Sequence, residues 1–571
     1  MSAIQCCFGS LILKVAQATD RVASPRASSE EAKRPIEPIP VHDPTAEVYP
    51  NGPSLAAITA GLFLAILCLG LDRSILATAI PKITTDFNSL PDVAWYGSAY
   101  LFTQCSFQLL FGKLYAEYNI KWIFLGALGV FEVGSVVCAA APDSVSLIVG
   151  RAVSGVGAAG LMSGALIIIA RSVPLHKRPT YTAAVGAAAG ISQCVAPTLG
   201  GVFVDKATWR WCFWINLPLG GVTFFVILLF FKLPVAAKGQ PMNPKQFFQN
   251  FDLIGTLLLI PWVICLLLAL QWGGTVYAWG SWRIILCWCV FAICFLVWGF
   301  VQYREGDRAT VPFRIMAQRS MICACWLMLL LFSLLFINVY YIPIWLQAVK
   351  NHSAYQSGID LLASSAPLSV ATILSGALTS RVGYYVPQFI ASSVIVSMAG
   401  GLMYTFAVDT STVFWAASLV LMGIGVGLGG QQTIIAAQTV FQGRDVALAT
   451  SLLVFLQSLG GTVFLAVAQN IFHSRLISDL HRRVPNVDAT VVVEAGASGL
   501  LGSMRQVYPD SADAIITAYS KALQNVFLIS AVLGCLTIFG AIFMEWKSVN
   551  VNKPGKAIKG EEKGTSGQLE G

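Results

Sequence analysis

Four charged residues stand inside long apolar stretches of this chain, and they are the side chains best placed to do chemistry. They are Asp72, Arg73, Glu132 and Arg151. If the apolar stretches cross a membrane, a charge near the centre costs about 2.5–3.5 kcal/mol on insertion scales. Such residues usually face a cavity or a partner.

Glu132 has the clearest chemical use. It stands about halfway along the apolar stretch 122–141, where its short side chain cannot reach the lipid headgroups. At neutral pH the carboxyl must be protonated or paired, because an isolated carboxylate is too costly in an apolar medium. A carboxyl there can take up and release a proton as its surroundings become dry or wet, which is the chemistry of proton coupling. The alternative is a structural carboxyl that stays protonated or hydrogen-bonded.

Asp72 and Arg151 are the other two candidates for proton coupling. Asp72 precedes Arg73 in "LGLDRSILATAIP", but adjacent helical residues point about 100° apart and do not face each other. Asp72 could line a cavity or orient the local backbone. Arg151 opens "GRAVSGVGAAGLMSG", whose small residues at helical spacing predict a face toward protein or water. Its permanent charge could modulate a carboxyl or bind an anion, and a structural bond to a carbonyl is the alternative.

Amides and aromatic residues in the later apolar stretches form a third set of candidates. Such side chains suit a cavity for a bulky, mostly apolar ligand with a few polar groups. Hydrogen bonds between helices explain the amides equally well. The candidates for lining a substrate cavity are Asn338, Tyr341, Gln431 and Gln432.

Composition identifies the elements that must position these residues. The chain has 571 residues, is 56% hydrophobic and only 11% charged, whereas soluble domains carry about 25% charged residues. The apolar stretches run for about 20 positions, long enough for membrane helices, without the alternation of barrel strands. The sequence therefore predicts an all-α polytopic membrane protein. Fourteen spans are expected, near 54–80, 92–112, 122–141, 145–170, 180–204, 211–232, 252–271, 282–303, 320–342, 358–380, 385–407, 411–438, 446–472 and 523–546.

Basic residues predict the orientation of these spans. With the N-terminus in the cytosol, the short cytosolic loops hold fourteen Lys and Arg residues and the short outside loops hold five, which follows the positive-inside rule. The net charge of +8 is then a feature of membrane topology and does not indicate nucleic-acid binding. The sequon Asn351-His352-Ser353 falls in an outside loop and is a candidate glycosylation site.

Motifs for other kinds of chemistry are absent from the sequence. There is no G-x-x-x-x-G-K-[ST] and no H-E-x-x-H, and the five histidines are scattered. An ATP-driven pump and a membrane hydrolase are therefore not expected. We expect that the protein is not an enzyme and that it binds no metal or cofactor. The remaining classes of membrane protein are a secondary carrier, a receptor and a structural protein.

Weak helix formers gather on one face of the fifth predicted span, in "GAAAGISQCVAPTLGG" (186–201). At 100° per residue, Gly186, Gly190, Gln193, Pro197 and Gly200 fall within a stripe less than 100° wide, and Gly201 follows. Small residues let a neighbouring helix approach closely, and Pro197 favours a kink. The stripe predicts a surface that re-seats between two conformations.

Several segments, in order, resemble the major facilitator superfamily, in its fourteen-span drug:proton antiporter branch and most of all its fungal members. "LDRSILATAIPKIT" is similar to the first-span motif, "GRAVSGVGAAG" to the fourth-span motif and "SQCVAPTLGG" to the fifth-span antiporter motif. "TWRWCFWINLPLGG" and "GIGVGLGGQQTIIAAQTVF" resemble fungal patterns at the sixth and twelfth spans. In the loop between spans two and three, "GKLYAEYNIKWIF" takes the place of the signature G-x-x-x-D-R-x-G-R-R.

This loop motif departs from the family pattern. Its residues include Gly112, Lys113 and Lys121, but Ala116 stands where the family has its acid, and Glu117 follows one position later. Asn119 and Ile120 replace the usual Gly and Arg. The salt bridge that the family makes from this loop is therefore not expected in its usual form.

The resemblance implies two six-helix bundles with an inserted helix pair, and alternating access to a site between the bundles. The expected parts are a disordered cytosolic tail (1–53), a first bundle (54–232), a loop and inserted pair (233–303), a second bundle (304–546) with an outside loop near 473–522, and a cytosolic tail (547–571).

The function expected from the resemblance is proton-driven export of a small, largely apolar secondary metabolite or xenobiotic. The chain would act as a monomer in the plasma membrane, or in a vacuolar or vesicle membrane. A proton-coupled importer of the same fold, for example of siderophore complexes, is the alternative, and a non-transporting receptor is a third.

Overall fold

The computed structural model describes residues 52–87, 92–231, 252–485 and 500–550, together with Pro50, Ser89, Val487 and Val492. Nearly all of the two expected tails, 1–53 and 547–571, lies outside these residues. The same holds for most of the loop that precedes the inserted helix pair.

Long helices occupy all fourteen predicted positions. They are α2 (Gly52–Phe87), α3 (Val93–Glu117), α4 (Ile120–Ala139), α5 (Ser144–Ser172), α6 (Arg178–Lys206), α7 (Trp211–Trp214) followed by α8 (Asn216–Phe230), α10 (Leu253–Trp272), α11 (Trp282–Glu305), α13 (Arg319–Ala348), α14 (Ala354–Asp360) followed by α15 (Leu362–Val382), α16 (Val386–Tyr404), α17 (Thr412–Val440), α18 (Arg444–Arg483) and α21 (Ala512–Ile542).

Thirteen helices in the described part of the chain are long and apolar enough to cross a membrane. The other predicted span, 92–112, forms α3, which is outside that group because it carries more polar side chains. Gln104, Ser106 and Gln108 of α3 are all buried, and the Gln108 amide donates a hydrogen bond to the Ala159 carbonyl of α5 at 3.0 Å. The polar residues of α3 therefore face protein and not lipid.

Two helix boundaries differ clearly from the predicted ones. Helix α18 continues to Arg483, beyond the predicted end at 472, and α21 begins at Ala512 instead of 523. The expected outside loop is shortened from both sides, and it contains the short helix α20 (Leu500–Val507). Amphipathic extensions of membrane helices lack the apolar length that hydropathy detects, which is why the sequence assigned these residues to a loop.

The helices pack in two groups joined along two seams. Helices α2 to α8 pack on one another, and α13 to α21 do the same. Helix α6 packs against α15 along one seam and α3 against α18 along the other. The pair α10 and α11 lies at the second seam, where α10 contacts both α3 and α18. The predicted fold class, two six-helix bundles with an inserted pair, is confirmed.

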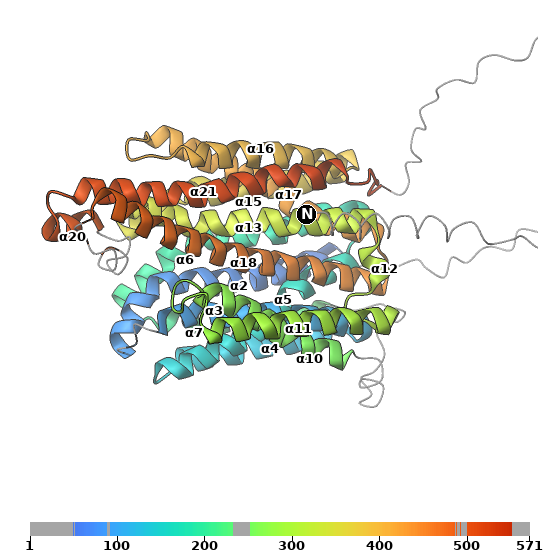
Figure 1. The fold of residues 1–571 in the computed structure, drawn as a ribbon. Coiled ribbons are helices and arrows are strands. Elements are labelled where there is room, and N and C mark those ends of the chain that lie inside the picture. Colours follow the sequence, from blue (N-terminus) through green and yellow to red (C-terminus); the bar gives the residue numbers. More distant parts are fainter. Residues whose placement is uncertain are drawn as a thin grey trace, which may run out of the picture. The chain divides into compact units, whose positions relative to one another are not determined.

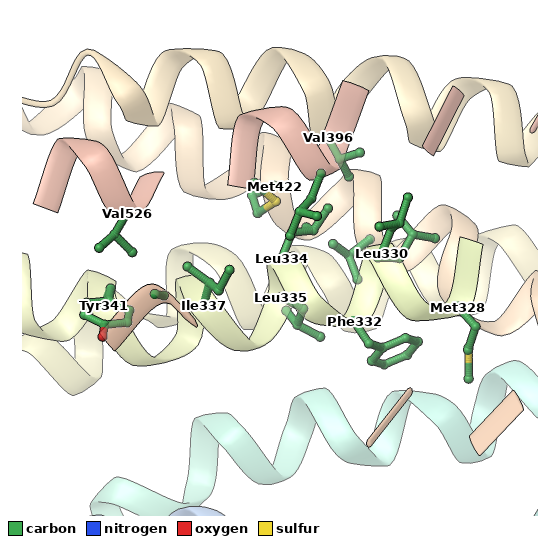
Figure 2. Packing of buried hydrophobic residues seen from close by; sticks show 14 of the residues in the cluster. Met328, Leu330, Phe332, Leu334, Leu335, Ile337, Tyr341, Val396, Met422 and Val526 are labelled. Atoms are coloured by element: carbon green, nitrogen blue, oxygen red, sulfur yellow. The ribbon is translucent and has the colours of Figure 1, made fainter. Parts of the chain in front are cut away.

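The helices run side by side, with α12 (Phe313–Met316) at one end of the molecule and α20 at the opposite end (Figure 1). The second bundle is held by aliphatic packing around α13. Leu330, Leu334 and Ile337 lie on the side of α13 that faces the other helices of its bundle, near Val396 and Val526 (Figure 2). Apolar cores of this kind position the polar side chains described next.

Candidate functional site

Asp72 and Arg151 form an ion pair in the core of the first bundle. Arg151 Nη1 lies 2.7 Å from Asp72 Oδ2, and both side chains are at most 1% exposed. The Arg151 Nε group donates to the Tyr96 carbonyl at 3.0 Å, and the guanidinium lies over the Tyr100 ring. Arg151 therefore pairs both with a carboxylate and with a backbone carbonyl.

Asn216 completes the coordination of Asp72. Its Nδ2 donates to Asp72 Oδ1 at 3.0 Å and lies 3.1 Å from Ser135 Oγ, while Cys68 Sγ donates to its Oδ1 at 3.3 Å. A buried charge needs satisfied hydrogen bonds as well as a counter-charge. Asn216 was not among the residues predicted from the sequence, where the available signal was an amide in the sixth apolar stretch.

Glu132 lies near this cluster but is not bonded to it. Both of its carboxyl oxygens are buried, and neither has a hydrogen-bond partner among the described residues. The carboxyl rests against α8 at Gly220, where an added Cβ would overlap Oε1. Asp72 and Glu132 are close enough to interact electrostatically with each other and with Cys68. The structure thus brings together all three candidates for proton coupling, one of them with no partner.

The four substrate-cavity candidates have different surroundings. Gln432 is fully buried and bonds within the second bundle, to Thr379 at 3.0 Å and to Ser375 at 2.8 Å. Asn338 is buried and accepts a bond from Ser530 at 3.2 Å. Gln432 and Asn338 thus join helices in this conformation, which supports the structural alternative for them.

Tyr341 and Gln431 complete the set. Tyr341 is buried and packs against Phe472, whose ring also contacts Tyr519. Gln431 is half-buried, and its side chain reaches α6 at Gly186 in the other bundle. Of the four candidates, Gln431 is therefore the one placed between the bundles.

The small-residue stripe of α6 faces the second bundle over most of its length. An added Cβ at Gly186 would meet Gln431 of α17, one at Gly190 would overlap Ser369 Oγ of α15, and Pro197 lies against Gly358 of α14. Gly200 departs from this pattern and packs on Thr78 and Ile75 of α2. Helix α6 is continuous through Pro197. Gln193, which belongs to the same stripe, is half-buried.

Gly190→Leu is expected to block transport, because the larger side chain cannot fit against α15 without separating the bundles, and overpacking of this kind costs about 1–3 kcal/mol. The matched control is Gly201→Leu, since an added Cβ at Gly201 meets nothing within 4 Å. Initial transport rates and surface expression of the two variants should be compared. Normal transport by Gly190→Leu would show that the close approach of α6 to α15 at Gly190 is not needed for transport.

Ionic and polar contacts join the bundles at the end of the molecule that carries the basic loops, here called the basic end. Arg444 of α18 lies 2.5 Å from Glu117 of α3, and Arg171 of α5 donates to the Gly443 carbonyl at 2.8 Å. Glu117 thus makes an inter-bundle salt bridge from the position that follows Ala116.

The remaining residues of the loop motif also lie at the basic end. Lys113 Nζ donates to the Arg308 carbonyl at 2.7 Å, Lys121 Nζ donates to the Leu228 carbonyl at 2.6 Å, and Gly112 packs on Ser451 of α18. Arg314 of α12 pairs with Asp445 and with Asp307. Its hydrogen bonds to these two carboxylates raise the pKa of Arg314.

Glu117→Gln is expected to slow transport only a fewfold, because ion pairs with partly exposed partners contribute about 0.2–1 kcal/mol. The exposed fraction is 21% for Glu117 and 42% for Arg444. Glu117 also lies 3.8 Å from the buried Lys113, so the pair is tested by removing both charges and not by exchanging them. The double variant Glu117→Gln with Arg444→Gln should slow transport by less than the two single changes combined. Asp479→Asn removes a pair near the far end of α18 and serves as the control. If the two single effects simply multiply in the double variant, the two residues do not act as a pair.

Asn351 follows the end of α13 and is exposed, with a φ of +56°. Ser353 of the same sequon begins α14, and its Oγ accepts a bond from the Gln356 backbone at 3.1 Å. The site therefore lies in the short connection between α13 and α14, where an acceptor asparagine is accessible.

The chain is similar to several fungal transport proteins. The sequence profile of the Major Facilitator Superfamily matches residues 62–465. The efflux pump aflT of Aspergillus parasiticus is 44% identical over 509 residues, which cover 89% of this chain and 98% of the relative. The MFS-type efflux pump MFS1 of Trichophyton rubrum is 46% identical, over 88% and 93% of the two chains. The efflux pump roqT of Penicillium rubens is 41% identical, over 90% and 94%.

Solved structures with the same fold are more distant in sequence. The proton:xylose symporter XylE is 13% identical, with a TM-score of 0.55 over 86% of this chain and 96% of the other. A bacterial homologue of the human lysosomal transporter Spinster is 15% identical, with a TM-score of 0.52 over 86% and 98%. These two likenesses concern the fold alone.

Proposed function

Because this chain belongs to the major facilitator superfamily, whose members are transporters and not enzymes, we propose that it is a proton-coupled antiporter that exports a small, largely apolar secondary metabolite or xenobiotic. Fungal relatives that match it over nearly their whole length are named efflux pumps. Export is therefore favoured over the importer alternative.

The observation that carries proton coupling is the buried carboxyl of Glu132, which has no hydrogen-bond partner among the described residues, beside the compensated pair Asp72–Arg151. A carboxylate without counter-charge or donor is too costly to bury, so Glu132 holds a proton in this conformation. Asp72 can stay ionised, because Arg151 and Asn216 satisfy both of its oxygens. In the proposal, Glu132 carries the proton, Asp72 tunes its release through charge repulsion, and Arg151 holds Asp72.

The packing of Glu132 against a glycine offers a way to expose it. Glu132 lies against α8 at Gly220, which has no side chain to cover the carboxyl. Movement of α8 away from α4 would admit water to the carboxyl and let its proton leave. The bundle contacts at the basic end are separate from this site and close the side that we propose faces the cytosol.

The test is uptake of a candidate metabolite into inverted membrane vesicles with an imposed proton gradient. Antiport predicts accumulation that depends on the chain and collapses when an ionophore removes the gradient. Uptake that persists undiminished after the ionophore would overturn proton coupling. Accumulation only in right-side-out vesicles would favour the importer.

A further inference from the structure

Arg73 differs from Glu132 in that it keeps its charge, and none of the described residues supplies a carboxylate to pair with it. It lies on α2 directly after Asp72, but its side chain is exposed, whereas that of Asp72 is buried. Its guanidinium carbon stands 3.9 Å from the centre of the Phe336 ring on α13. Arg73 therefore reaches from the first bundle to the second.

The surroundings of Arg73 place it inside the protein and not toward lipid. It interacts electrostatically with Tyr100 and Cys105 of α3 and with Arg151 of α5. Gly70 of α2 packs on Ser192 of α6, while Ile75 packs on Gly200, so Arg73 lies level with the middle of the α6 stripe. A guanidinium facing lipid would be costly. An exposed guanidinium between the bundles is accessible to water or to a ligand.

The charge of Arg73 is not compensated by the nearby carboxylate. Asp72 is already satisfied by Arg151 and Asn216, and no carboxylate is among the groups that act on Arg73. Among the described residues, none accepts a hydrogen bond from its guanidinium. Five N–H donors are therefore available, while the Phe336 ring holds the group by a cation–π contact.

We infer that Arg73 and Phe336 form a binding site for an aromatic or otherwise apolar ligand that carries an anionic group, such as a carboxylate, phenolate or enolate. The acid pairs with the guanidinium, and the apolar body of the ligand lies along the Phe336 ring. This inference rests on the proposed transport function, and it narrows the substrate from largely apolar compounds to amphipathic acids.

The test compares two probes with nearly the same apolar body. Anilinonaphthalene sulfonate is an anion, and N-phenylnaphthylamine is its uncharged counterpart. Binding of each to the full chain in lipid nanodiscs is measured by fluorescence, without any proton gradient. We expect Arg73→Gln to weaken binding of the anion by about tenfold, the effect of losing one charged hydrogen bond, and to leave the neutral probe unchanged. Arg73→Lys should still bind the anionic probe more tightly than the neutral one, though by a smaller factor than the unaltered protein.

The control variant is Lys82→Gln, which removes a positive charge from the same helix. Lys82 is exposed and pairs with Asp86 on the same helix at 3.5 Å. The Lys82→Gln variant should bind both probes with the same affinities as the unaltered protein. Equal anion binding by Arg73→Gln and the unaltered protein would overturn the inference, as would an equal loss for both probes. Because no gradient is present, this site and proton coupling can fail independently.

Discussion

Arg151→Met is expected to abolish transport and to destabilise the protein by about 3–5 kcal/mol, because it leaves a buried carboxylate without a counter-charge. Asp72 and Arg151 are 1% exposed or less and lie 2.7 Å apart. The measurements are thermal unfolding in detergent and uptake in vesicles. The double variant Asp72→Leu with Arg151→Met should recover most of the lost stability, since apolar pairs often replace buried ion pairs without loss. It should not recover transport.

The double variant separates a structural role from a functional one. If transport returns together with stability, the pair only holds the bundle together. If the single variant is as stable as the unaltered protein, Asp72 is protonated when its partner is lost. The exposed pair Arg482–Asp479 provides the control, because its removal should change neither measurement.

Glu132→Gln is expected to abolish gradient-driven uptake while leaving exchange of substrate between the two sides intact. The amide has the shape of the protonated acid but cannot release a proton. Folding should be little affected, because the Glu132 oxygens have no hydrogen-bond partner to lose among the described residues. Uptake and exchange are measured in the same vesicles.

The two activities must diverge for the assignment to hold. Unchanged gradient-driven uptake by Glu132→Gln would remove this carboxyl from the mechanism, and loss of both activities would make its role structural. Asp409→Asn alters an exposed carboxyl between α16 and α17 and should leave both activities unchanged.

The fold could be predicted from sequence because its signal is local. Each apolar stretch is long enough to cross a membrane on its own, and every predicted span corresponds to a helix. Errors arose where the signal weakens: α18 and α21 extend past the apolar residues, and the sixth and tenth spans each divide into two helices.

The site could be predicted only in part because its contacts are long-range. Sequence identified Asp72, Glu132 and Arg151 through their cost in an apolar setting, but the partners Asp72 and Arg151 are 79 residues apart. Asn216 was missed because single amides are common in membrane helices, where many of them form hydrogen bonds between helices without a functional role. The α6 stripe was found from helical periodicity, yet only packing shows that Gly190 faces the second bundle and Gly200 the first.

Part of the contact at the basic end is made by cations that bond to backbone carbonyls. Lys113 and Arg171 donate to the carbonyls of Arg308 and Gly443. A peptide carbonyl does not titrate, and it is present whatever side chain its residue carries. Acidification of that compartment therefore leaves these acceptors intact, and the acceptor positions are free to change side chain during evolution. We therefore expect relatives to keep these lysine and arginine contacts even where the residue that supplies the carbonyl has a different side chain.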